Sequence, residues 1–235
     1  SIFKMLKNFF PIRFSYFLTK QILNGKIFKE NINIIFALYN LKLDPWHHFN
    51  STTKEKEIIT ILKKSNYLKK KFSFVEVGSG FGFLSLKILS IFKFSKAFLF
   101  DARKDVSEKY KKLGKKKLNI DFFNYLIGEN KKKEYFLVHS DPNLSSRFAL
   151  KKTDYIVEGN MIRNQLVSKY IHQMYPLDYF KKKFTKNIIL SIDVQGGEYE
   201  VLKGCSKLFC ENLVKLIILE ISNIKKYKKK KSASF

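Results

Sequence analysis

The sequence contains few of the residues that crosslink a chain or bind a metal ion. Its only cysteines are Cys205 and Cys210, and neither belongs to a CxxC pair or to a Cys/His ligand set. The spacing therefore indicates neither a disulfide framework nor a zinc site. A reducing cytosol suits such a chain.

Arginine is also scarce, occurring only at positions 13, 103, 147 and 163, so lysine carries nearly all of the net charge of +26. The chain is rich in Ile, Phe, Asn and Tyr as well, a mixture typical of translated A/T-rich DNA. Arginine is the preferred fork for bidentate contacts with phosphates and bases. We therefore interpret the charge as coding bias on a solvated surface. A functional basic face that attracts nucleic acid or anionic lipid is the alternative.

No apolar run approaches the roughly 18 residues that a membrane-spanning helix requires. The N-terminal stretch FKMLKNFFPIRFSYFLTK is interrupted by lysine, arginine and Pro11, unlike a signal peptide. The chain begins at Ser1, which leaves upstream targeting undecided. We expect a cytoplasmic protein, with peripheral contact at the inner membrane face as an alternative. At 235 residues and 45% hydrophobic content, it should fold around one core.

The hydrophobic pattern changes along the chain from helical to alternating. Residues 1–50 predict a helical flank or lid, and Thr52 opens a capping box for a helix that runs to Ser65. Strands are expected at 72–77, 96–101, 121–127, 188–193 and 214–222, with helices at 83–94, 105–113 and 198–209. An irregular insert at about 129–187 includes a hairpin-like region and a helix at 164–174. This order predicts an α/β domain over 51–223 with a mostly parallel sheet, followed by a basic tail at 224–235.

The first predicted strand runs into a glycine loop, EVGSGFG, which then enters a helix. Glycines let a backbone turn sharply and approach a ligand whose negative end meets free N–H groups. A dinucleotide fingerprint would need its third glycine at position 83, where Phe83 stands. The spacing is instead G-x-G-x-G with an acid two residues earlier, which predicts a nucleotide-like ligand of another kind. Tight packing alone is the alternative interpretation.

This loop resembles motif I of the S-adenosylmethionine-dependent methyltransferases with the Rossmann-like fold. The resemblance implies that the loop wraps the methionine and ribose part of S-adenosyl-L-methionine, and that Asp101, at the end of the next strand, faces the ribose hydroxyls. It also implies that the acid before the glycines orients the loop and the cofactor ammonium. The implied cofactor-binding residues are Glu76, Gly78, Ser79, Gly80, Gly82 and Asp101.

The segment SIDVQGGEYEVLKG, followed by LIILEIS, resembles the C-terminal signature of FkbM-type methyltransferases, K-x-D-V-x-G-x-E-x-x-V-L-x-G. The matching positions are Asp193, Val194, Gly196, Glu198, Val201, Leu202, Gly204 and Glu220. Looser matches are Asn124, Gly128, Ser145, Ser146, Leu177 and Asp178, so the resemblance spans about residues 50–223. Ser191 replaces the usual lysine. Only 13 residues follow Ser222, so either the sheet lacks its last antiparallel hairpin or the chain is a fragment.

The acids of this signature are the candidate catalytic residues. Asp193 and Glu220 should end parallel strands at the edge where open α/β sheets bind ligands. Glu198 begins a helix, where the dipole favours its ionised form, so it either orients the acceptor or only stabilises the helix. A divalent cation held by Asp193, Glu220 and Asn223 is a weaker alternative, and we assign no metal. Isolated histidines that could act as bases are His47, His48, His139 and His172.

The resemblance implies an O-methyltransferase that acts on a hydroxyl of a saccharide or glycolipid-like acceptor, as in polysaccharide biosynthesis. Two alternatives remain. A nucleic-acid methyltransferase would usually carry an N/D-P-P-Y/F box after the fourth strand, where this chain has VQGGEY. An inactive methyltransferase-like domain could instead bind an anionic surface. The acceptor's identity and the oligomeric state do not follow from the sequence.

Overall fold

The structure, a computed structural model, describes residues 53–65, 71–92, 96–113, 119–150, 154–157 and 160–220. The helical flank expected over 1–50, the Thr52 cap and the tail at 224–235 lie outside these residues. Within the described ranges, no helix is both long enough and apolar enough to cross a membrane.

Five parallel strands form the central sheet, in the spatial order β10-β9-β1-β2-β3. They are β1 (Ser73–Val77), β2 (Lys96–Phe100), β3 (Ile120–Phe123), β9 (Ile188–Ile192) and β10 (Val214–Leu219). Every residue of β1 and β9 is buried, as expected for central parallel strands covered on both faces. Because β2 and β9 flank β1 on opposite sides, the topological switch point lies between β1 and β9. The predicted α/β class with a mostly parallel, Rossmann-like sheet is confirmed.

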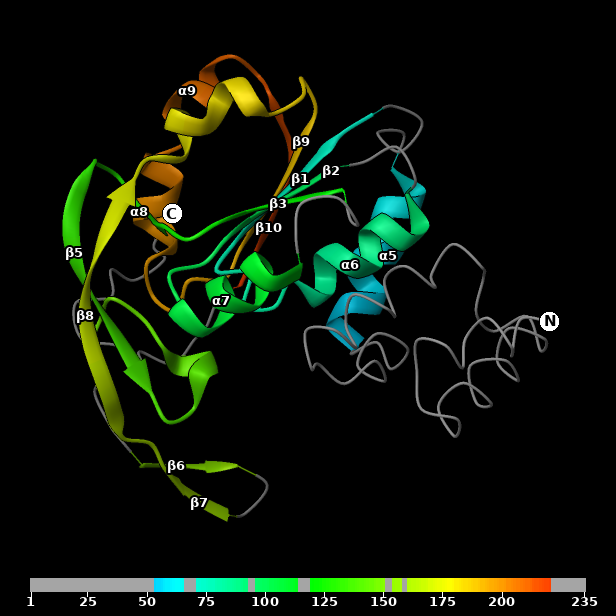
Figure 1. Cartoon of the computed structure of the whole chain (residues 1–235). Coiled ribbons are helices and arrows are strands. Elements are labelled where there is room, and N and C mark those ends of the chain that lie inside the picture. The colour runs from blue at the N-terminus through cyan, green and yellow to red at the C-terminus, as the bar shows by residue number, and fades with distance from the viewer. Residues whose placement is uncertain are drawn as a thin grey trace.

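Helices cover both faces of this sheet (Figure 1). One face carries α5 (Thr53–Lys64), α6 (Phe83–Ile91) and α7 (Lys104–Leu113), and the other carries the 3-10 helix η4 (Leu177–Lys183), α8 (Glu198–Lys203) and α9 (Ser206–Cys210). The helix predicted after Thr52 is present as α5, which buries Ile58 and Leu62 against the sheet.

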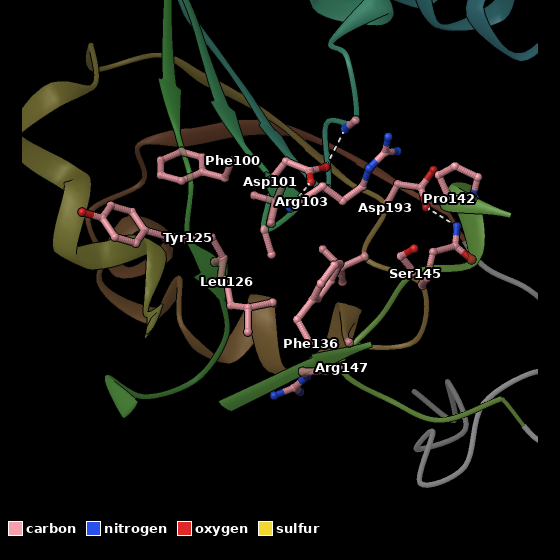
Figure 2. A pocket seen from close by; sticks show the side chains of 18 of the residues that line it. Phe100, Asp101, Arg103, Tyr125, Leu126, Phe136, Pro142, Ser145, Arg147 and Asp193 are labelled. Carbon is pink, nitrogen blue, oxygen red and sulfur yellow. Dashed lines mark hydrogen bonds between the residues drawn. The ribbon is translucent and has the colours of Figure 1, made fainter. Parts of the chain in front are cut away.

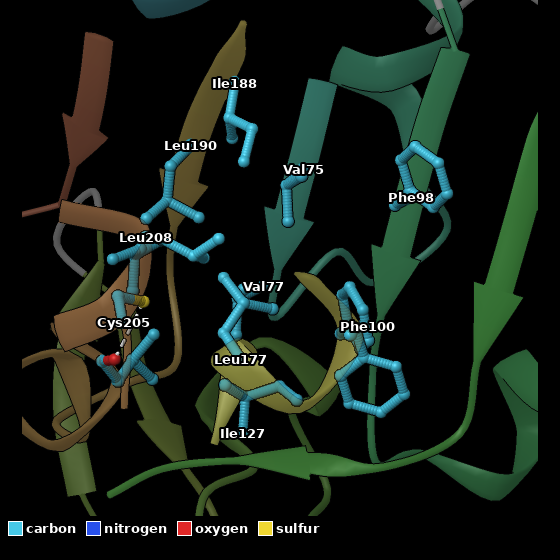
Figure 3. Close-up of a cluster of buried hydrophobic side chains, with 13 residues drawn as sticks. Val75, Val77, Phe98, Phe100, Ile127, Leu177, Ile188, Leu190, Cys205 and Leu208 are labelled. Carbon is cyan, nitrogen blue, oxygen red and sulfur yellow. Dashed lines mark hydrogen bonds between the residues drawn. The ribbon is translucent and has the colours of Figure 1, made fainter. Parts of the chain in front are cut away.

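The larger core cluster lies between the sheet and the η4, α8 and α9 layer (Figure 3). Val75 and Val77 of β1 belong to this cluster, together with Leu177 of η4 and Leu208 of α9. Successive strand residues point to opposite faces of a sheet. Glu76, between the two valines, therefore points toward the α6 layer on the other face.

The insert forms a second sheet, which corrects two sequence predictions. Its strand order is β4-β8-β5, made of β4 (Leu126–Ile127), β5 (Lys132–His139) and β8 (Leu166–Tyr175). The helix predicted at 164–174 is wrong, because β8 pairs antiparallel with β5 along its length. The third strand predicted at 121–127 is also divided. It breaks at Asn124, whose side-chain amide donates to the Asp101 carbonyl at 2.8 Å, and β4 then joins the second sheet.

Smaller elements complete the insert and the C-terminal half. A two-stranded hairpin comprises β6 (Asp154–Val157) and β7 (Asn160–Arg163), and a short 3-10 turn, η3, spans Pro142–Leu144. The single helix predicted at 198–209 is two helices, α8 and α9, separated at Gly204. A Cβ at Gly204 would lie 2.1 Å from the Gly128 carbonyl oxygen, so the two backbones meet there. This contact explains the glycine at position 204, whereas a Cβ at Gly128 would instead lie 2.5 Å from the Met174 sulfur.

Candidate functional site

A cavity of about 330 Å³ opens at the carboxyl ends of the central strands, beside the switch point (Figure 2). Strands β1, β2 and β9 supply one wall, and the second sheet and the η3 region close the opposite side. The cavity is lined by Val77, Gly78, Gly80, Phe100, Asp101, Ala102, Arg103, Tyr125, Leu126, Ile127, Phe136, Pro142, Ser145, Arg147, Asp193, Val194, Gln195, Gly197 and Glu220. Five of the predicted site residues line this cavity: Gly78, Gly80, Asp101, Asp193 and Glu220.

The glycine loop after β1 has the backbone that its composition predicts. Gly78 and Gly80 have φ of 76° and 52°, values that residues with a Cβ rarely adopt. A Cβ at Gly78 would lie 1.9 Å from the Asp193 carbonyl oxygen, so this glycine lets β1 and β9 approach. A Cβ at Gly80 would meet nothing within 4 Å. Gly80 therefore faces open space, as a loop that cradles a ligand should.

Asp101 is buried at the end of β2 and is tied to the glycine loop. Its carboxylate accepts the backbone N–H of Gly80 at 2.7 Å and that of Arg103 at 2.8 Å (Figure 2). Burial raises the pKa of Asp101 to about 6, although both N–H donors oppose this shift. The group is then mostly ionised at neutral pH. A carboxylate offers about four acceptor positions, so it can still receive two ligand hydroxyls.

Glu76, Ser79 and Gly82 do not line the cavity. The Glu76 carboxyl lies on the α6 side of the sheet and accepts a hydrogen bond from the Ser85 hydroxyl. Burial raises the pKa of Glu76 to about 8. Ser79 donates to the neighbouring Gly80 carbonyl, and Gly82 precedes the first residue of α6. Contacts of these three residues with a cofactor remain a prediction.

The other side of the cavity carries Asp193 and Glu220, which follow β9 and β10 as predicted. The Gln195 side-chain amide donates to the Asp193 carboxylate at 2.7 Å. Glu198 lies outside the lining. Its carboxylate accepts the Gly196 N–H at 2.9 Å, which shapes the turn before α8. The structure thus brings Asp193 and Glu220 to the cavity and gives Glu198 a local contact.

Several lining residues were not identified from the sequence. Gln195 occupies an unspecified position of the signature, between Val194 and Gly196, and Phe136 and Arg147 come from the insert, whose fold does not follow from the sequence. The Ser-Ser pair did carry a signal. Ser145 lines the cavity, and the Ser146 hydroxyl donates to the Gln195 carbonyl at 2.8 Å, joining the insert to the β9 turn.

Asp178, a looser match to the family signature, has a structural contact rather than a place in the cavity. Its carboxylate accepts the backbone N–H groups of Lys207 and Leu208 at 2.9 and 3.0 Å, and the Ser206 hydroxyl at 3.2 Å. These are donors at the start of α9 that lack partners within the helix. The residue therefore fixes α9 onto η4.

The cavity is acidic although the protein is strongly basic. The chain has 42 lysines, which is 46 basic residues less four arginines, yet no lysine lines the described cavity. Three carboxylates do: Asp101, Asp193 and Glu220. Both lining arginines form ion pairs, Arg103 with Asp105 at 2.7 Å and Arg147 with Glu200 at 3.1 Å. The charge balance favours a ligand with cationic groups.

Among the described residues, no histidine lines the cavity and no cluster of metal-binding side chains is present. His139 is buried, and burial lowers its pKa. His139 and His172 do not line the cavity, and His47 and His48 lie outside the described residues. In the described ranges no group of three or more His, Cys, Asp or Glu side chains could hold a metal. Asn223, the third expected ligand, is outside them.

Comparison with protein families identifies a methyltransferase FkbM domain over residues 90–235, which is more than half of the chain. The glycine loop at 78–82 precedes the matched region. No curated protein and no solved structure matches the chain. The strand order, the cavity at the switch point and the domain match agree, and the chain therefore belongs to the FkbM family of methyltransferases.

Proposed function

We propose that this protein transfers a methyl group from S-adenosylmethionine to a hydroxyl of a saccharide or glycolipid-like acceptor. Family membership supports methyl transfer. The observation that carries the cofactor assignment is the cavity with three carboxylates and no lysine among its described lining residues. S-adenosylmethionine bears a sulfonium and an ammonium group. Carboxylates near such cations are stabilising, whereas lysines would repel them.

The residues of the cavity fit this cofactor. The open space at Gly80 leaves room for a ligand against the loop backbone. Asp101 retains acceptor positions for two ribose hydroxyls. The apolar side chains of Phe100, Tyr125 and Leu126 offer a surface for a purine ring. When bound, the cofactor supplies an activated methyl group.

Asp193 and Glu220 would form the acceptor side. In the proposed reaction, Asp193 orients the acceptor hydroxyl and accepts its proton as the new carbon–oxygen bond forms and the carbon–sulfur bond breaks. Glu220 accepts a hydrogen bond from a second hydroxyl of the saccharide. In-line displacement depends mainly on alignment, so two carboxylates fixed at neighbouring strand ends suit it. A direct role for Glu198 remains a prediction.

The same lining argues against a nucleic-acid substrate. A phosphate backbone would need cations near the cavity, and both lining arginines already form pairs with Asp105 and Glu200. Lysines elsewhere on the surface do not alter the acidic lining. A small neutral polyol is therefore the better acceptor for this site.

Isothermal titration calorimetry with S-adenosylmethionine tests the cofactor assignment. Asp101→Asn should weaken binding about 10- to 100-fold, because hydrogen bonds to a charged group contribute about 1.5–3 kcal/mol. The matched control is Asp121→Asn, which makes the same chemical change on β3, where Asp121 pairs with Lys96 outside the cavity. The control should bind like the unmodified protein.

Transfer is then measured with radiolabelled methyl groups against a set of saccharides, glycolipids and nucleic acids. Label should enter saccharide hydroxyls. An unmodified protein without affinity for S-adenosylmethionine or its demethylated product would refute the proposed function. Label in nucleic acid alone would refute the acceptor class.

A further inference from the structure

Gln195 has a left-handed backbone conformation, which residues with a Cβ rarely adopt. Its φ is 56°, and the described residues contain only one other non-glycine residue with positive φ, Asn212. Asparagine tolerates this left-handed region, whereas for most residues with a Cβ it costs about 1–2 kcal/mol. Such strain persists where surrounding contacts hold it, and it is common at functional sites.

The contacts that hold Gln195 reach both sides of the cavity. Its carbonyl accepts the Ser146 hydroxyl at 2.8 Å, which ties the residue to the insert. Its side-chain amide donates to the Asp193 carboxylate at 2.7 Å, and both residues line the cavity (Figure 2). The next residue, Gly196, also has positive φ, 107°. The sharp turn therefore brings the Gln195 amide back onto the acid at the end of β9.

A neutral donor is suited to this contact. An amide N–H fixes one oxygen of a carboxylate and leaves its net charge unchanged, whereas a lysine would neutralise it. The family lysine two residues before Asp193 is Ser191 here, a buried residue of β9. Gln195 therefore supplies the Asp193 carboxylate with a neutral donor, and position 191 of the strand supplies no cation.

We propose that Gln195 is a positioning residue, which holds the Asp193 carboxylate at the angle needed to orient the acceptor hydroxyl and which couples that angle to the insert through Ser146. The inference rests on the proposed function for its kinetic consequence. Its structural part, that Asp193 turns when the amide is removed, stands on the described contacts alone.

The test compares Gln195→Met, which keeps the length and removes the donor, with the control Asn212→Gly, which changes the other strained residue away from the cavity. Gln195→Met should lower kcat about 10- to 100-fold, with the Kd for S-adenosylmethionine within about threefold of the unmodified protein. The acid side of its pH–rate profile should move to higher pH, because a donor to the carboxylate has been lost. Asn212→Gly should leave kcat and the profile unchanged.

Crystal structures of the unmodified protein and of Gln195→Met provide a readout that does not require turnover. Asp193 should adopt a different side-chain rotamer in the variant. An unchanged rotamer, or an unchanged kcat with an unchanged profile, would overturn the inference. If the unmodified protein fails to bind S-adenosylmethionine, the proposed function fails, and the rotamer comparison still decides the structural claim.

Discussion

Replacing Glu76 with glutamine should remove a pH dependence of folding that the buried carboxyl imposes. The group lies between the sheet and α6, where the hydroxyl and the backbone N–H of Ser85 donate to it. Burial outweighs these donors and raises its pKa from 4.5 to about 8. Repulsion from Asp193 and Asp101 makes a smaller contribution to this rise in pKa. The folded protein therefore retains a proton that the unfolded chain releases between these two pH values.

The size of the effect follows from linkage. The folded protein binds the Glu76 proton more tightly than the unfolded chain does, and this difference stabilises the fold. The stabilisation is fully present below pH 4.5 and is lost as the pH rises through about 8. Each pH unit within that window changes the free energy of unfolding by about 1.4 kcal/mol. From pH 5 to pH 8 the loss is about 3 kcal/mol. Glutamine resembles the protonated acid and does not titrate, so Glu76→Gln should escape this loss.

Urea unfolding followed by circular dichroism at pH 5, 6, 7 and 8 measures the effect. The variant's stability relative to the unmodified protein should increase by about 3 kcal/mol across this series, whatever the offset at pH 5. Glu57→Gln, on the exposed side of α5, controls for loss of one acidic side chain. A difference between Glu76→Gln and the unmodified protein that stays constant with pH would refute the reasoning.

Three further substitutions test the glycine loop and the layer of η4, α8 and α9. Gly78→Ala should destabilise the fold by about 3 kcal/mol or more, because its methyl would overlap the Asp193 carbonyl. Gly80→Ala, which has open space around the new methyl, should cost only about 1–2 kcal/mol and chiefly weaken S-adenosylmethionine binding in calorimetry; equal unfolding of both variants would contradict the open cradle. Asp178→Ala should lower stability by about 1–2 kcal/mol in urea unfolding without changing cofactor affinity, since it removes the cap of α9. An affinity change at unchanged stability would contradict that structural role.

The central sheet could be predicted from sequence because its strands are short apolar runs bounded by loops. Asp101 and Asp193 could be placed at the cavity for the same reason, since both follow such runs. The direction of Glu76 was also predictable. It alternates with Val75 and Val77, which pack on the opposite face of the sheet, and period two sends its carboxyl toward α6.

The insert could not be predicted in the same way. Within LVSKYIHQMY, Leu166, Tyr170 and Met174 recur every four residues, which fits a helix as well as a strand. The segment forms a strand because it pairs with β5, some thirty residues earlier in the sequence, and this pairing does not follow from the local pattern. The Gln195 contact depends on a backbone angle, and single residues in the left-handed region leave no composition signal unless they are glycine.

The close approach of Gly78 to the Asp193 carbonyl has a consequence for how this family could diversify. It joins the glycine loop and Asp193 directly through β1 and β9, without involving the insert. Under the proposed function, the distance between methyl donor and acceptor is then a property of the sheet. The insert contributes the outer wall through Phe136, Ser145 and Arg147. Exchange of the insert could therefore change which acceptor enters the cavity, while the distance between the methyl donor and the acceptor stays constant.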